Sequence, residues 1–351
     1  MKIKNIVLVC LALTLMLIPA TGCKEGAKYE ALELVPEGIN MLAGIQVSEA
    51  LRNWQIYSEL EGSENAEKPF DEMRDSFADE IGIDLNDITN AVIFAKTSST
   101  ETMEYTGIIL EGNFTDKDLI GNIEKETGNQ FETENYEGFT LYTDSNADDA
   151  LVTLNNTMII IGSIQAVKDC IDVINGDLSM ETGAVLDTYD DMGNVMVKLA
   201  MMIPAEAKQS FADQPEQDMM PVGLESFEDM QSLGLAADLG TQTLTISVNL
   251  DFSTSDSAVK AAESLETMID FVAMMSQDEE SAEIFTGLEI TTGGSRVYID
   301  YEISLDELTE MAESFEDSAG FPMMPSDSFD MELPEDFEFP DEFELPEIPE
   351  E

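Results

Sequence analysis

Most residue combinations that support enzymatic chemistry are missing from this chain of 351 residues. It contains no histidine, so neither a Ser-His-Asp nor a Cys-His nucleophile can be assembled, and zinc loses its commonest nitrogen ligand. The chain also lacks the Gly-x-x-x-x-Gly-Lys-Ser/Thr loop and the Gly-x-Gly-x-x-Gly turn that cradle nucleotide phosphates. We therefore expect a protein that is not an enzyme and carries no cofactor.

Two patterns resemble catalytic motifs but have simpler interpretations. Ser257 and Lys260 have the Ser-x-x-Lys spacing of penicillin-binding proteins, but the companion Ser-Asp-Asn and Lys-Thr-Gly motifs are absent. Because Ser257 lies where a helix should start, we interpret it as a helix cap. Paired carboxylates could hydrolyse a glycosidic bond, but among 74 Asp and Glu residues no pair stands out. A carboxylate-based hydrolase is therefore the last of our alternatives.

Metal and soft-ligand sites have equally weak support in the sequence. The segment from Asp144 to Asp148 begins like a calcium loop, but Asp149 replaces the required glycine and Asn155 the bidentate glutamate. We interpret this segment as a polar hairpin connection. Adjacent methionines could bind soft ions or line an adaptable groove, although packing in a core suits adjacent positions better. These pairs are Met201-Met202, Met219-Met220, Met274-Met275 and Met323-Met324.

The first 23 residues predict export. Lys2 and Lys4 precede a predominantly apolar run over residues 6–18, which suits a signal peptide but is too short to span a bilayer. Small residues then lead to Cys23, and this arrangement resembles the lipobox of prokaryotic lipoproteins. The resemblance implies cleavage after residue 22, lipidation of Cys23 and a location on the extracytoplasmic face of the cell membrane. An ordinary cleaved signal peptide is the alternative.

The remaining cysteines predict no disulfide framework. Cys10 lies in the apolar leader and is removed with it, which leaves Cys170 as the single thiol of the body. Cys170 lies in a segment with helical spacing, and we expect it to be a buried structural thiol. The body enters its first strand through Leu34-Val35-Pro36, and in this it resembles uncharacterised envelope lipoproteins.

The charge of the chain restricts its partners. Its 74 acids and 15 bases give a net charge of −59. Nucleic acids are excluded, because binding them requires clustered basic residues. An anionic lipid surface would also repel the body, so the membrane contact must come from the lipid anchor. The acidity suits either a saline habitat or loose association with Ca²⁺ or Mg²⁺.

Hydrophobic periodicity divides the chain into five parts. They are a signal peptide (1–22), a tether (23–34), a first α+β module (35–180), a second α+β module (190–317) and an acidic Phe/Pro tail (318–351). The last strand and helix of each module occupy matching places, which predicts an internal duplication. The tail should be disordered because it combines acids with prolines. It could dock on a protein partner or serve as a solvating brush.

Strands joined by hairpins and followed by helices predict an α+β class, with an antiparallel sheet in each module and helices packed on one face. The pattern is compatible with one joined curved sheet or with an open ligand groove. We expect a lipid-anchored extracytoplasmic protein of the cell envelope that acts as a non-catalytic binding or interaction module. The alternative is a carrier of an apolar ligand in a Met-rich groove.

The net charge generates a first prediction. Repulsion among like charges opposes a compact state, and about 0.15 M salt screens charges beyond roughly 8 Å. We expect the melting temperature of the protein to rise as NaCl or CaCl₂ is added, as measured by circular dichroism. A melting temperature that responds to neither salt would show that the charge has no role in stability.

Overall fold

The computed structural model describes residues 30–53, 83–96, 105–114, 119–127, 130–144, 149–205, 208, 224–240, 243–275, 287–305 and 307. The chain divides into two compact units, Met1–Glu307 and Leu308–Glu351. All described residues belong to the first unit, so the described parts of both expected modules fall within it. The expected signal peptide and acidic tail lie outside the described residues.

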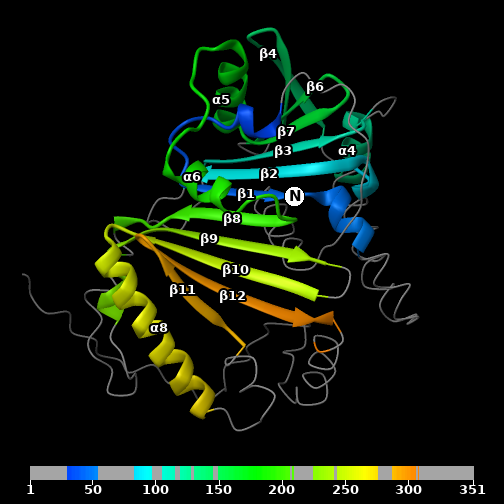
Figure 1. Cartoon of the computed structure of the whole chain (residues 1–351). Coiled ribbons are helices and arrows are strands. Elements are labelled where there is room, and N and C mark those ends of the chain that lie inside the picture. The colour runs from blue at the N-terminus through cyan, green and yellow to red at the C-terminus, as the bar shows by residue number, and fades with distance from the viewer. Residues whose placement is uncertain are drawn as a thin grey trace, which may run out of the picture. The chain divides into compact units, whose positions relative to one another are not determined.

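Twelve strands form one antiparallel sheet (Figure 1). Its order is β11-β12-β10-β9-β8-β1-β2-β3-β7-β6-β5-β4. The strands are β1 (Met41–Ile45), β2 (Ile88–Lys96), β3 (Tyr105–Gly112), β4 (Phe131–Tyr136), β5 (Phe139–Asp144), β6 (Asp149–Leu154), β7 (Met158–Ser163), β8 (Val197–Met202), β9 (Met230–Leu239), β10 (Thr243–Phe252), β11 (Glu289–Gly293) and β12 (Arg296–Ser304).

Helices of several lengths connect these strands. The α-helices with labels are α4 (Leu119–Thr127), α5 (Ile164–Asn175), α6 (Ala184–Asp191) and α8 (Ser255–Met275). Short 3₁₀ helices are η1 (Ala31–Leu34), η2 (Leu85–Asp87) and η3 (Leu224–Phe227). A further helical stretch follows β1 at residues 47–53. This mixture of antiparallel strands and helices is the expected α+β class.

The two sides of the sheet meet where β1 pairs with β8. Met41 lies opposite Met201, and Ile45 lies opposite Val197. One side runs outward as β1-β2-β3-β7-β6-β5-β4 and the other as β8-β9-β10-β12-β11. The first five strands of the β1 side therefore follow the same succession as the five strands of the β8 side. Of the two arrangements compatible with the sequence, the structure has the single joined sheet.

Helices pack on both faces of the sheet. Successive side chains of a strand point to opposite faces. Leu42 and Phe94 pack in one buried cluster with residues of α5 and α6, whereas Ala43 and Ile93 pack with residues of α4 in another. We call the face with α5 and α6 face A, and the face with α4 face B.

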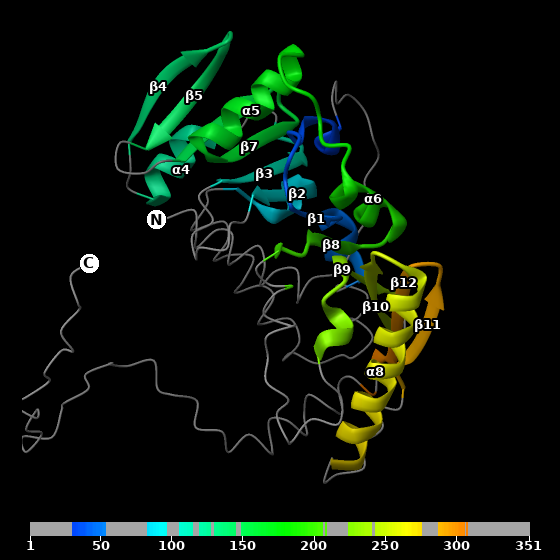
Figure 2. The same ribbon diagram turned by 90° about the vertical axis from the view of Figure 1, so that its left-hand side faces the viewer.

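The long helix α8 also lies on face B. Its residue Ala258 shares a buried cluster with Leu250 and Val297, and Figure 2 shows the helix alongside β11 and β12. The prediction that helices cover a single face is therefore wrong. The physical reason lies in the central strands: residues 91–95 of β2 are all buried, so apolar side chains on both faces require cover.

The body begins earlier than the expected tether allows. Residues 31–34 were assigned to the tether, but they form η1, in which Ala31 and Leu34 are buried. The Ala31 amide donates a hydrogen bond to Glu111 Oε1 at 2.9 Å. Ala31 and Leu34 are three residues apart, so one turn of helix places both apolar side chains against the body. Only residues 23–30 remain for a tether.

Close contact between β3 and β2 generates the second prediction. A Cβ atom added to Gly107 would lie 2.1 Å from Cζ of Phe94, which is fully buried. Overpacking of this kind costs about 1–3 kcal/mol, so Gly107→Ala should lower the free energy of unfolding in urea melts by that amount.

The matched control is the double variant Gly107→Ala with Phe94→Leu. The smaller side chain makes room for the added methyl group, so the double variant should lose less stability than the two single variants added together. Strict additivity of the two losses would contradict this close contact.

Candidate functional site

The strands on the β8 side of the sheet have two chemically different faces. In β10, polar and apolar residues alternate along the whole strand. Asp251 hydrogen-bonds to Ser232 and lies 3.4 Å from Thr188 of α6, which places the odd-numbered residues of β10 on face A. Leu250 packs in the cluster that contains α8, which places the even-numbered residues on face B. Each face therefore offers a different kind of surface.

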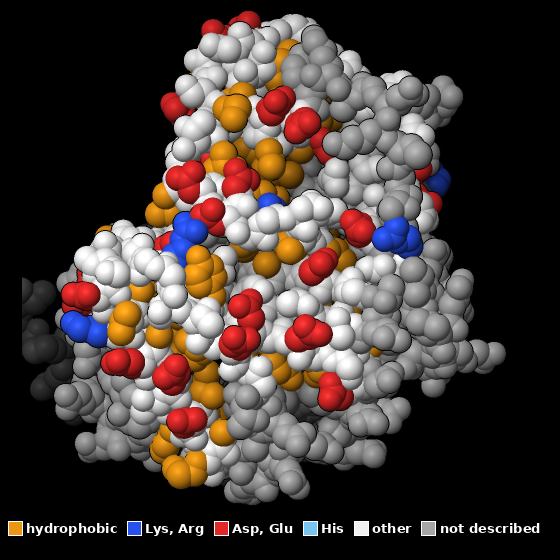
Figure 3. Space-filling view, viewed as in Figure 1, with side chains coloured by type: hydrophobic (Ala, Val, Ile, Leu, Met, Phe, Trp, Pro, Cys, Tyr) orange, Lys and Arg blue, Asp and Glu red, His pale blue; other side chains and the backbone are white. Residues whose placement is uncertain are grey.

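Face A of β10 and β12 is polar. Thr245 lies opposite Glu302, and Ser247 lies opposite Asp300, to which its hydroxyl donates a hydrogen bond of 2.5 Å. Figure 3 views the molecule from this face and shows acidic side chains scattered over it. Within the described ranges, no three His, Cys, Asp or Glu side chains are grouped so as to hold a metal ion.

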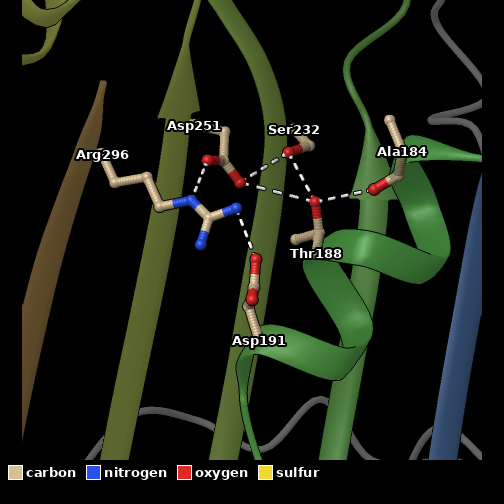
Figure 4. A network of polar contacts seen from close by, with 6 residues as sticks. All are labelled: Ala184, Thr188, Asp191, Ser232, Asp251 and Arg296. Atoms are coloured by element: carbon tan, nitrogen blue, oxygen red, sulfur yellow. Dashed lines mark hydrogen bonds and ion pairs between the residues drawn. The ribbon is translucent and has the colours of Figure 1, made fainter. Parts of the chain in front are cut away.

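A charged cluster fastens α6 to this face (Figure 4). Arg296 Nε donates to Asp251, and Arg296 Nη2 lies 2.5 Å from Asp191 Oδ2 at the end of α6. The second oxygen of Asp251 accepts a 3.0 Å hydrogen bond from Ser232 Oγ, which is 2.8 Å from Thr188 Oγ1. We call these five residues the Arg296 cluster. It joins β12, β10, β9 and α6 through side chains alone.

The electrostatics of the cluster keep Arg296 charged. Burial of the guanidinium opposes its charge and lowers the pKa, but hydrogen bonds to Asp251 and Asp191 outweigh burial, so the net pKa of Arg296 is raised. Both carboxylate oxygens of Asp251 are occupied by partners. Asp251 is thus a positioning residue for α6 and not a free acid or base.

A second cation holds the end of α6. Lys198 Nζ donates hydrogen bonds to the carbonyl oxygens of Tyr189 at 3.1 Å and Gly193 at 2.9 Å, and it lies 3.9 Å from the centre of the Tyr189 ring. Carbonyl groups at the end of a helix attract cations. Burial lowers the pKa of Lys198, while the charge of Asp190 acts in the opposite direction.

Face B of the same strands is mostly apolar, with Tyr301 of β12 opposite Ile246. The register sets Leu199 of β8 beside Leu235 of β9, Val248 of β10 and Ile299 of β12 in one row across the sheet. A neighbouring row contains Met201 and Leu233, and another contains Ala237 and Ile246. We call this surface the apolar grid, and its members are Leu199, Met201, Leu233, Leu235, Ala237, Ile246, Val248 and Ile299.

The grid lies between two buried clusters and is not fully buried itself. Each of its side chains is partly exposed. Leu199 and Ala237 pack against the cluster near α4, while Leu233, Val248 and Ile299 pack against the cluster under α8. Leu235 and Ile246 lie between these clusters. The partly exposed apolar side chains between the two clusters form a candidate binding surface.

The residues that the sequence singled out are not brought together. Cys23 lies outside the described residues. Cys170 is fully buried in α5, which confirms the structural thiol, and burial raises its pKa. Ser257 is near the start of α8, as expected, but the cap is the Thr254 hydroxyl, which accepts from the Ser257 amide at 3.1 Å. The Ser257 hydroxyl instead donates to Asp229 at 2.6 Å.

The methionine pairs and the calcium-like segment do not form a common site among the described residues either. Met201 lies on face B and belongs to the grid, whereas the adjacent Met202 packs against the cluster on face A. Met274 on α8 is 73% exposed. Met219-Met220, Met323-Met324 and residues 145–148 lie outside the described residues. None of the helices that the structure describes is both long and apolar enough to cross a membrane.

Comparison with known proteins gives few relatives. No family model matches the chain. It is 32% identical over 200 residues to an uncharacterised protein, MJ0635, of Methanocaldococcus jannaschii, a match that covers 54% of this chain and 66% of that relative. The matched part thus spans slightly less than two thirds of the relative. Crystal form III of TP0453 matches with a TM-score of 0.44 and 13% identity, over 82% of this chain and 100% of that chain. Crystal form I of the same protein matches with a TM-score of 0.44 and 12% identity, over 82% of this chain and 98% of that chain.

The Arg296 cluster, which no sequence motif indicates, generates the third prediction. Arg296→Met leaves Asp251, whose side chain is 15% exposed, without its cation. Loss of a partly buried charged hydrogen bond should lower the free energy of unfolding by about 1–3 kcal/mol, measured in urea.

The control is Lys260→Met, which removes the same charge from an exposed position on α8. Such a surface change should alter stability by less than about 0.5 kcal/mol. Equal losses in the two variants would mean that net charge, and not the cluster, accounts for the effect.

Proposed function

We propose that this protein is a lipid-anchored, extracytoplasmic binding module of the cell envelope, built from two related α+β modules and without catalytic activity. The observation that supports a binding role is the apolar grid on face B. Its side chains are neighbours on the sheet and remain partly exposed, and contiguous apolar surface that retains exposure is typical of a binding site. The groups on the opposite face are either engaged in the Arg296 cluster or arranged as a polar surface, which suits contact with water or cations.

The anchor rests on the leader sequence and on where the packed body begins. Cys23 follows an apolar run and small residues, and the body starts at Ala31. About seven residues lie between them, which span at most ~25 Å when extended. A lipid on Cys23 would therefore keep the body close to the membrane surface.

The relation of the two modules is supported by the strand order. The successions β1-β2-β3-β7-β6 and β8-β9-β10-β12-β11 are equivalent about the β1–β8 pair. In each, a hairpin is followed by a helix on face B, α4 in one half and α8 in the other. A duplicated unit whose copies pair edge to edge would produce this arrangement.

The carrier of an apolar ligand is the second candidate. It is favoured by one specific observation: Leu235 and Ile246 lie between two buried clusters and remain partly exposed. A carrier would bind a small apolar molecule there, whereas an interaction module would bind the surface of a macromolecule.

The fourth prediction tests the anchor. Cys23→Ser removes the only thiol next to the expected cleavage site, so the protein should appear in the soluble fraction or remain as an uncleaved precursor. Fractionation of cells and mass measurement of the mature chain would show which occurs. Cys10→Ser is the matched control, because it also removes a thiol from the leader, and it should leave membrane retention unchanged. Membrane retention of a correctly processed Cys23→Ser protein would disprove the anchor.

A further inference from the structure

We propose that the outer edge of β11 pairs with the same edge of a second copy of this chain, so that the two sheets join across a two-fold axis. We call this contact the seam. The inference goes beyond the proposed binding role, because it concerns assembly and uses the edge of the sheet instead of its faces. It requires neither Cys23 nor the acidic tail.

The outer edge of β11 is accessible. Among the strands that the structure describes, β11 and β4 are the two ends of the sheet, and each pairs with a single neighbour. Four of the five residues of β11 are exposed, and Ile290 is partly buried. An exposed edge strand presents a row of backbone N–H and C=O groups with which another strand can pair.

The register of the β11–β12 hairpin shows which backbone groups point outward. Ser295 O accepts a hydrogen bond from the last amide of β10, so the odd-numbered residues of β12 hydrogen-bond to β10. The even-numbered residues, such as Tyr298, therefore hydrogen-bond to β11. Tyr298 lies opposite Thr291. It follows that Ile290 and Thr292 direct their backbone N–H and C=O groups away from β12.

These outward groups are complementary to themselves in an antiparallel pair. When Thr291 lies opposite its counterpart in the second copy, Ile290 of each chain lies opposite Thr292 of the other. Each of these two pairs exchanges two backbone hydrogen bonds. The side chains are all β-branched at these positions, and such cross-strand pairs stabilise a sheet. This register aligns the whole length of both strands.

The distribution of charge favours the β11 edge over the β4 edge. Glu289 is the only charged residue of β11, and in this register it lies opposite Gly293 of the second copy. The two Glu289 carboxylates are then about 14 Å apart along the strands, which exceeds the screening length of about 8 Å at 0.15 M salt. By contrast, β4 exposes Glu132 and Glu134 on one face. Pairing β4 with itself would bring these carboxylates together, which protects that edge.

The net charge makes the seam dependent on salt. Two copies that each carry a charge of −59 repel one another. This repulsion acts over about 30 Å at 0.01 M salt but over only about 3 Å at 1 M salt. We therefore expect monomers at the lower concentration and dimers at the higher one, which we call high salt.

The first test is cross-linking of the purified full chain carrying Thr291→Cys, oxidised with diamide in high salt. Directly opposed residues at a position without mutual hydrogen bonds have Cα atoms about 4.5 Å apart, which a disulfide can bridge. We expect a dimer on a non-reducing gel, in at least about tenfold greater yield than for Glu289→Cys, the matched control on the same face of β11. A mixture of Glu289→Cys and Gly293→Cys should cross-link again, because these positions oppose each other. The unchanged chain sets the background from Cys23.

The second test removes one outward backbone donor. Thr292→Pro deletes an N–H that does not bond to β12, so the sheet keeps its own ladder. Thr292→Val is the matched control, because it changes the side chain and keeps the N–H. Measured by sedimentation in high salt, Thr292→Pro should dimerise at least about tenfold more weakly, whereas Thr292→Val should dimerise like the unchanged chain.

Circular dichroism establishes that each variant is folded, and the cross-linking test does not depend on Thr292→Pro. A chain that stays monomeric in high salt would overturn the proposal, as would equal cross-linking of Thr291→Cys and Glu289→Cys or unchanged association of Thr292→Pro. Oligomers larger than dimers would also contradict it, because a two-fold contact is closed. If Thr291→Cys, oxidised in membranes, cross-linked to another protein instead of to itself, the edge would belong to a different partner.

Discussion

The pairing of β1 with β8 is the interaction on which the rest of the structure depends. All five residues of β1 are buried, and the strand pairs with β2 on its other side. A buried backbone group without a partner costs about 1–3 kcal/mol, so separating the two sides would leave one unpaired edge on each. Gln46 strengthens the connection between β1 and β8, because its side-chain Nε2 donates hydrogen bonds to Val195 O at 2.8 Å and to Asn194 Oδ1 at 3.1 Å. The two sides of the sheet therefore belong to one compact unit.

The residue types on each face of the strands match the helices that pack on that face. On the β1 side, α5 lies over face A, and the strands beneath it carry fully buried residues such as Ile109 and Ile160. On the β8 side, α6 is fastened over β8 and β9 by the Arg296 cluster, and the strands beyond it carry polar residues such as Ser247 and Asp300 on this face. Face B has the opposite composition there, so the polar and apolar surfaces of the second half lie back to back on the same strands.

Local patterns in the sequence predict most of the elements but not how they meet. The alternation of β10 and the helix after Ser163, whose hydroxyl accepts from the Ala166 amide at 3.3 Å, could both be predicted, since each depends on neighbouring residues. The short helix α6 and the strongly polar strand β4 lack a periodic apolar pattern and were missed. The Arg296 cluster could not be predicted either, because its members come from four elements that only the folded sheet brings together. The face of the sheet on which α4 and α8 pack could not be predicted either, because it depends on the register of the strands.

The N-terminal segment links the expected anchor to both sides of the sheet. Glu181 is 5% exposed, and its carboxylate accepts backbone hydrogen bonds from Gly38 at 2.6 Å, Ile39 at 3.3 Å and Gly183 at 2.5 Å. This residue lies between α5 and α6, so it ties the entering chain to the segment that connects the two halves. Asn40 then accepts from the Met202 amide at 2.8 Å, and its own amide donates to Ala95 O at 3.0 Å. A chain held this way cannot swing freely at its point of entry. A short tether on Cys23 would therefore restrict the orientation of the whole sheet at the membrane, and with it the direction in which each face points.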